Sequence, residues 1–106
     1  MTNQVILFGN FNQLLEELDE DEKEWIKKIV EQLKENAYVG KRLRFEWFRE
    51  KKYKNKRLYY LIYDELQIVV LTSFATKKDQ DRVIEQILFD KEIYRDFAKN
   101  YFEKTR

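Results

Sequence analysis

Apolar and polar residues alternate in three runs between Lys41 and Lys78, and this pattern predicts three strands of one sheet. Strands favour β-branched and aromatic residues whose side chains point alternately to two faces. The strands are expected over 43–48, 57–63 and 68–74, with a cation-rich turn between the first two and a reversal over 64–67. The third run is apolar on both faces as far as Thr72. It is therefore expected to be the most buried strand, covered by helices on at least one side.

The segment before this sheet predicts a short strand and two helices. Residues 4–8 are apolar and end at Gly9, which fits a strand that joins the sheet from outside the main meander. Asn12 is expected to cap a brief helix, and Asp19 to begin a longer one with Glu22 completing a capping box. Apolar residues then recur every three or four positions and form the buried stripe of the longer helix: Trp25, Ile26, Ile29, Val30, Leu33 and Ala37.

Two helices are predicted after the sheet. Thr76 or Asp79 is expected to cap the first, and Asp90 to start the second. The whole order is β-α-α-β-β-β-α with an extra C-terminal helix, which is an α+β domain with helices packed on a small antiparallel sheet. With 106 residues the chain is expected to be a single domain, 1–106, that buries roughly 65% of its unfolded surface.

Composition narrows the possible chemistry. The chain has no cysteine and no histidine, so thiolate nucleophiles, disulfides and the usual general base near neutral pH are excluded. Acidic residues between Glu16 and Glu24 lack the spacing of a calcium loop, and no glycine-rich loop could cradle a nucleotide. We therefore expect no metal and no cofactor. No apolar run approaches the ~20 residues of a membrane span and no secretory signal begins the chain, so a cytoplasmic protein is expected.

Positive charge is concentrated between positions 41 and 57, where nine basic residues face only two acidic ones. Cations can hold phosphates and aromatic rings can stack on unpaired bases, so this mixture indicates single-stranded RNA. The alternative is a solvated hairpin tip, because lysine also keeps edge strands soluble. The candidate RNA-binding residues are Arg49, Lys51, Lys52, Lys56, Tyr53 and Tyr59.

Lys77 and Lys78 form a second cationic group where the third strand is expected to meet a helix. Strand-to-helix junctions aim side chains and backbone amides at a crevice beside the sheet, which favours a phosphate there. The same lysines, beside Asp79 and Asp81, could instead be a surface cluster of ion pairs. Arg57 lies on the strand that should pair with the third, so both cationic groups could converge on one side of the sheet.

Three segments carry a resemblance to a known family. The order of elements, the run KRLYYLIY from Lys56 to Tyr63 and the run IVVLTSFATKK from Ile68 to Lys78 resemble the RelE/ParE toxin superfamily. Phe74 followed by the Lys77-Lys78 pair is most similar to the HigB-like branch. The resemblance covers nearly the whole chain, through short motifs.

The resemblance implies the toxin of a type II toxin–antitoxin system, and for the RelE and HigB branches a ribosome-dependent endoribonuclease that cuts mRNA. It implies that Arg57 holds the scissile phosphate, that Lys77 or Lys78 is the cation at the strand exit, and that Lys54 belongs to the catalytic group. It also implies a cognate antitoxin as partner. The segment 89–106 is longer than a minimal member needs, which suggests a cover over the site or a homodimer.

Two alternatives of other classes remain at this stage. One is a non-nuclease poison of DNA gyrase, as in the ParE branch. The other is a catalytically inactive RelE-like module that binds nucleic acid or protein. The final helical segment lacks the early tyrosine or histidine of some family members, because Tyr94 and Tyr101 come late.

Overall fold

The computed structural model describes residues 2–106, which form five strands and four α-helices. The strands are β1 (Gln4–Leu7), β2 (Lys41–Arg42), β3 (Phe48–Tyr53), β4 (Lys56–Tyr63) and β5 (Ile68–Thr76). The helices are α1 (Phe11–Glu17), α2 (Glu20–Glu35), α3 (Gln80–Phe89) and α4 (Lys91–Thr105). Short 3-10 helices cover Ala37–Val39, Asp64–Leu66 and Lys77–Asp79. No helix in this described part combines the length and the apolar character needed to cross a bilayer.

The strands form one mixed sheet in the order β1-β5-β4-β3-β2. The pairs β2–β3, β3–β4 and β4–β5 are antiparallel, whereas β1 runs parallel to β5, with Gln4 opposite Ile68. The predicted α+β class, the first strand outside the meander and the extra C-terminal helix are confirmed. The expectation of a purely antiparallel sheet is wrong, because the chain returns through α1 and α2 before it enters the meander.

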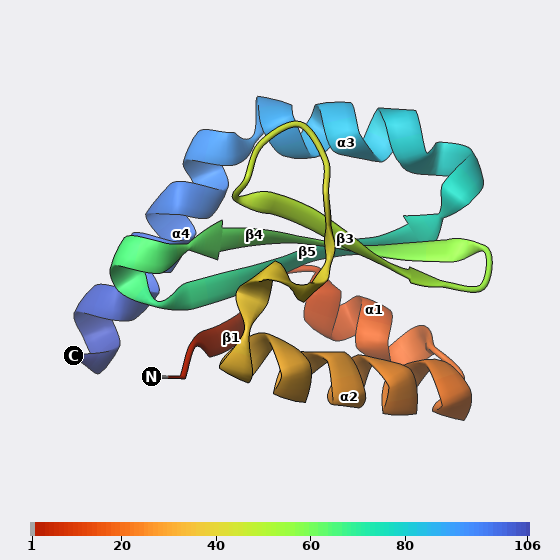
Figure 1. Cartoon of the computed structure of the whole chain (residues 1–106), viewed down its shortest axis with the longest axis horizontal. Helices are drawn as coiled ribbons and strands as arrows, with labels where there is room; N and C mark the ends of the chain where they lie inside the picture. The colour runs from red at the N-terminus through yellow and green to blue at the C-terminus, as the bar shows by residue number, and fades with distance from the viewer. Residues whose placement is uncertain (1) are drawn as a thin grey trace.

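Helices cover both faces of the sheet, α1 and α2 on one side and α3 and α4 on the other (Figure 1). Alternate residues of β4 serve the two layers: Leu58, Tyr60 and Ile62 pack under α1 and α2, and Tyr59, Leu61 and Tyr63 under α3 and α4. β5 is buried from Ile68 to Thr72, but β4 is buried from Arg57 to Tyr63. The central strand β4, not β5, is thus the most buried one.

The helix starts show which caps the sequence encodes. Asp19 caps α2 with the full capping box, in which its carboxylate accepts from the Glu22 N–H and the Glu22 carboxylate accepts from the Asp19 N–H. That prediction is confirmed. Asn12, in contrast, lies inside α1, which already begins at Phe11 because the buried ring of Phe11 anchors that turn to the core.

The strand expected over 43–48 is wrong. Residues 43–47 form a loop in which the rings of Phe45 and Trp47 stack 4.7 Å apart, and β3 follows as Phe48–Tyr53. Most of the expected cation-rich turn therefore belongs to β3, and only Lys54 and Asn55 form the turn. β3 tolerates polar side chains because its outer neighbour β2 has only two residues and leaves much of it near the sheet edge.

Candidate functional site

The turn between β3 and β4 and the exit of β5 lie at the same end of the sheet (Figure 1). The Lys77 N–H donates to the Asn55 carbonyl at 2.7 Å, and Arg57 of β4 lies opposite Ala75 of β5. Across the turn, Lys52 lies opposite Arg57. We call this the cationic end, and it comprises Lys52, Lys54, Arg57, Lys77 and Lys78.

Lys54 takes a backbone conformation that only glycine adopts freely. Its φ is 54°, in the left-handed region, at the first position of the two-residue turn. Lysine in this region costs on the order of 1–2 kcal/mol relative to its relaxed backbone. The side chain is exposed, and its Nζ lies 5.3 Å from the centre of the Tyr53 ring. The turn therefore carries strain and presents a cation at its tip.

Arg57 is the buried member of the cationic end, with only 8% of its side chain exposed. Its Nη1 donates to the carbonyls of Lys56 at 3.0 Å and Lys54 at 3.3 Å, and its Nε lies 3.8 Å from Oε2 of Glu50. Glu50 belongs to β3, and its side chain is also 8% exposed. The arginine predicted to hold a phosphate thus faces an internal carboxylate.

Glu50 has a second partner from the start of α3. Nε2 of Gln80 donates to Oε1 of Glu50 at 2.7 Å. Beside them, the hydroxyl of Tyr59 is fully buried and makes no hydrogen bond, alone in this among the buried side-chain polar atoms of residues 2–106. Burial, together with the nearby Glu50 carboxylate, raises the pKa of Tyr59 to about 12. The side chains of β3, β4 and α3 therefore form a compact polar cluster behind the cationic end.

Several predicted RNA-binding residues have other roles in the structure. The rings of Tyr53 and Trp25 pack 4.9 Å apart, and Lys56 forms an ion pair with Glu22 of α2. Lys51 lies half-buried opposite Leu58, on the α2 side of the sheet. These three residues border the cationic end but point toward α2, away from Arg57.

Two predictions fit the structure poorly. Tyr59 has no exposed surface, so its ring cannot stack on a base without unfolding the core around it. Arg49 donates to the Gly40 carbonyl at 3.1 Å and to Glu46 at 2.7 Å, and its guanidinium lies 4.9 Å from the Tyr38 ring centre. It supports the loop before β3 at the other end of the strand and is not part of the cationic end.

The residues that the sequence pattern missed are Glu50 and Gln80. Glu50 stands two positions before Lys52, so strand alternation places it on the same face as Lys52 and Arg57. With the strand assigned to 43–48, that alternation could not be seen.

No group of three or more potential metal-ligating side chains occurs within the described residues, at the cationic end or elsewhere.

The arrangement can bind and polarise a phosphodiester. Four exposed lysines give cations that are free to reach phosphate oxygens, and Arg57 stands behind them with a rigid guanidinium. Glu50 adds a carboxylate, a group that can accept a proton. An acid, a base and anion-binding groups thus meet at one end of the sheet.

Solved structures with the same fold are toxins and toxin–antitoxin complexes. A mutant of Escherichia coli toxin RelE in the free state matches with a TM-score of 0.67 at 18% identity, over 76% of this chain and 90% of that one. The intact E. coli RelBE toxin–antitoxin complex matches with a TM-score of 0.62 at 18% identity, over 70% and 95%. The toxin–antitoxin complex RelBE2 from Mycobacterium tuberculosis matches with a TM-score of 0.62 at 22% identity, over 72% and 99%.

These likenesses confirm the predicted resemblance at the level of the fold. No protein-family model and no curated protein sequence matches the chain. The chain has the RelE fold, and none of these structures singles out the HigB-like branch.

Proposed function

We propose that this chain of RelE fold is the toxin of a type II toxin–antitoxin pair and that it cleaves mRNA on the ribosome. The observation that carries the proposal is the meeting of four exposed lysines with the Arg57–Glu50 pair at one end of the sheet. Its partners are an antitoxin protein, as in the RelBE complexes of the same fold, and mRNA on cytoplasmic ribosomes.

The proposed reaction is an internal transesterification of RNA. The ribose 2′-oxygen attacks the adjacent phosphorus, the bond from phosphorus to the 5′-oxygen breaks, and a cyclic phosphate and a 5′-hydroxyl result. Glu50 accepts the proton of the 2′-hydroxyl, and Lys77 or Lys78 donates a proton to the leaving 5′-oxygen. Arg57 and Lys54 stabilise the charge that develops on the phosphorane oxygens.

The proposal requires that RNA competes with Glu50 for Arg57. The Nε of Arg57 is 3.8 Å from Glu50, longer than a hydrogen bond, so the guanidinium keeps donor capacity for an incoming phosphate. Gln80 is half-buried at the start of α3 and covers Glu50 from outside. Substrate binding must therefore displace the amide of Gln80 or pass beside it.

The Arg57–Glu50 pair also favours a second candidate function. Arg57 is almost fully enclosed, and three protein groups already engage it. A chain that keeps this state when RNA is present would bind RNA through its exposed lysines and cleave nothing. This is the inactive binding module considered from the sequence.

The deciding experiment compares expression of the wild-type chain with Lys77→Ala combined with Lys78→Ala. Both side chains are exposed, so the variant is expected to fold. The wild type should arrest growth and leave cleaved mRNA on translating ribosomes, whereas the variant should cleave at least about 100-fold more slowly. The control is Lys99→Ala with Lys104→Ala, which removes two exposed lysines of α4 and should keep full toxicity.

The outcomes separate the candidates. Intact mRNA with salt-sensitive RNA binding would select the binding module and reject cleavage. Intact mRNA with DNA damage would reject both in favour of a gyrase poison. Co-expression of a protein encoded beside the toxin gene should restore growth if the toxin–antitoxin assignment holds.

A further inference from the structure

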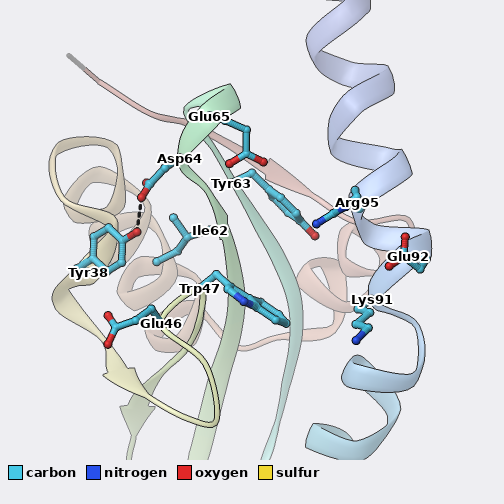
Figure 2. A pocket seen from close by; sticks show the side chains of 10 residues that line it. All are labelled: Tyr38, Glu46, Trp47, Ile62, Tyr63, Asp64, Glu65, Lys91, Glu92 and Arg95. Atoms are coloured by element: carbon cyan, nitrogen blue, oxygen red, sulfur yellow. Dashed lines mark hydrogen bonds between the residues drawn. The ribbon is translucent and has the colours of Figure 1, made fainter.

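A cavity of about 350 Å³ lies at the opposite end of β4 from the cationic end. Its lining comes from four separate segments of the chain and comprises the residues drawn in Figure 2: Tyr38, Glu46, Trp47, Ile62, Tyr63, Asp64, Glu65, Lys91, Glu92 and Arg95. Four of these side chains are carboxylates and two are cations, so the lining carries net negative charge. The volume falls within the usual range of ligand sites, about 300–1,000 Å³.

The cavity has two unlike walls. Tyr38, Glu46 and Asp64 stand on one side and the α4 residues Lys91, Glu92 and Arg95 on the other, with Trp47 between them (Figure 2). The Tyr38 hydroxyl donates to Asp64, and this hydrogen bond raises the pKa of Tyr38 to about 12. Glu65 and Glu92 form no ion pair within the described residues. The wall with Tyr38, Glu46 and Asp64 therefore suits a cation, and Lys91 and Arg95 of the other wall can donate to hydrogen-bond acceptors.

The hydroxyl of Tyr63 points into the space between the walls. Tyr63 as a whole is only 8% exposed, but its hydroxyl is open to the cavity and forms no hydrogen bond with residues 2–106. Figure 2 shows this hydroxyl directed toward Arg95. A hydroxyl that is open to the cavity and unpaired within residues 2–106 can donate to, or accept from, an occupant.

Exposed apolar side chains occur near the cavity, and two of them, Phe45 and Phe89, line a neighbouring hollow. The large hydrophobic side chains that are exposed in residues 2–106 all belong to the lining or to segments adjacent to it: Tyr38 at 40%, Val39 at 39%, Phe45 at 43%, Phe89 at 85% and Ile93 at 54%. Such a gathering marks a contact surface, and protein interfaces are enriched in tyrosine, tryptophan, phenylalanine and arginine.

We propose that this cavity binds a basic side chain, arginine or lysine, of a polypeptide whose neighbouring residues are apolar. The basic group would lie beside Trp47 against Asp64 and Glu65, whose carboxylates attract a cation. The backbone carbonyls of the same polypeptide would accept from Tyr63, Lys91 and Arg95. A free polyamine has no hydrogen-bond acceptors for Tyr63, Lys91 and Arg95. RNA would be repelled by the carboxylates of the lining.

The proposal is independent of the proposed mRNA cleavage, since it uses none of the residues of the cationic end. A similar contact occurs next to the cavity: the guanidinium of Arg49, which is not part of the lining, lies 4.9 Å from the ring centre of Tyr38. Trp47 is held in place in the lining, since its carbonyl accepts from the Ile62 N–H at 2.8 Å and Phe45 stacks on its ring.

The test is an NMR titration of the full chain, labelled with nitrogen-15, with two capped peptides, Leu-Arg-Leu and Leu-Gln-Leu. The arginine peptide should shift the Trp47 indole N–H and the amides of Asp64 and Glu65 in a saturable way. Asp64→Asn combined with Glu65→Gln should weaken this binding at least about tenfold and leave the rest of the spectrum unchanged. Glu16→Gln combined with Glu24→Gln, which neutralises two carboxylates beside a separate groove, should bind like the wild type.

Three results would overturn the proposal. The two peptides could bind equally, which would remove the role of the cation. The shifts could lie outside the cavity. Spermidine or single-stranded RNA could bind there as tightly as the arginine peptide, which would remove the polypeptide as the occupant.

Discussion

Glu50 and Arg57 face each other across β3 and β4, with Oε2 of Glu50 3.8 Å from Nε of Arg57 and both side chains 8% exposed. A buried pair of this kind is costly to break, because removal of one partner leaves an uncompensated charge. It also suits a carboxylate for proton transfer beside a cation for a phosphate. Substitutions at Glu50 or Arg57 can therefore test whether the pair serves stability, catalysis or both.

Glu50→Gln should have opposite effects on RNA binding and on cleavage. The amide keeps the size of the side chain and can still bond to Gln80, but it no longer accepts a proton or neutralises Arg57. We expect tighter RNA binding in a filter-binding assay and cleavage reduced by about 10²–10⁴-fold. Full cleavage by this variant would exclude Glu50 as the base.

The adjacent residues Tyr59 and Tyr60 should respond differently to loss of the hydroxyl, although both are fully buried. The Tyr60 hydroxyl donates to the Ala37 carbonyl at 2.8 Å and accepts from the Gly40 N–H at 3.0 Å, whereas that of Tyr59 has no partner. Tyr60→Phe should lower the free energy of unfolding by about 1–3 kcal/mol. Tyr59→Phe should leave it unchanged or raise it, as measured by urea denaturation; an equal loss in both variants would contradict this account.

Lys54→Gly should stabilise the hairpin while it weakens RNA binding. Glycine relieves a φ of 54° at a gain of roughly 1 kcal/mol, but the substitution also removes one cation from the cationic end. Gln67→Gly is the matched control, since Gln67 has a φ of 53° and carries no charge. Both variants should unfold at higher urea concentration, and only Lys54→Gly should reduce the salt dependence of RNA binding, by about 0.7 in the logarithmic slope.

Stability should fall steeply in alkaline solution. Burial raises the pKa of Tyr59 and of Tyr60 from 10.0 to about 12 in the folded chain. Below pH 10 these groups are neutral in both states, so they add no pH dependence. Between pH 10 and 12 the unfolded chain loses these protons first, and each tyrosine lowers the unfolding free energy by up to about 1.4 kcal/mol per pH unit.

The measurement is urea denaturation at pH 8, 10 and 11, with phenolate absorbance to follow ionisation. Tyr60→Phe removes one of these contributions and should make the decline less steep. A wild-type chain whose stability is constant from pH 10 to 11 would show that these tyrosines ionise equally in both states.

Periodicity predicted the helices and the central strands well, because each has one apolar face that must be buried. The stripe from Ile26 to Leu33 and the alternation from Arg57 to Tyr63 depend only on local sequence. The strand at Phe48–Tyr53 escaped this logic, since it carries mostly polar side chains and is held by pairing with β4. Its backbone hydrogen bonds are made with β4, so no pattern within its own sequence indicates the strand.

The candidate site was predictable in part for the same reason. Sequence placed Arg57 and Lys77 on neighbouring strands, and their meeting follows from that order. Glu50 and the cavity around Trp47 depend on the register of β3 and on where α4 packs, which only the tertiary structure defines.

The cationic end and the acidic cavity lie at opposite ends of β4, whose eight residues span about 26 Å. In this chain of net charge +1, the cluster of lysines and the lining of the acidic cavity thus carry charges of opposite sign. In low salt the chain should turn as it diffuses toward a polyanion and arrive with its lysines leading. Its orientation on the polyanion would then be set before any contact forms. The acidic cavity would face away from the polyanion and stay accessible to a second partner.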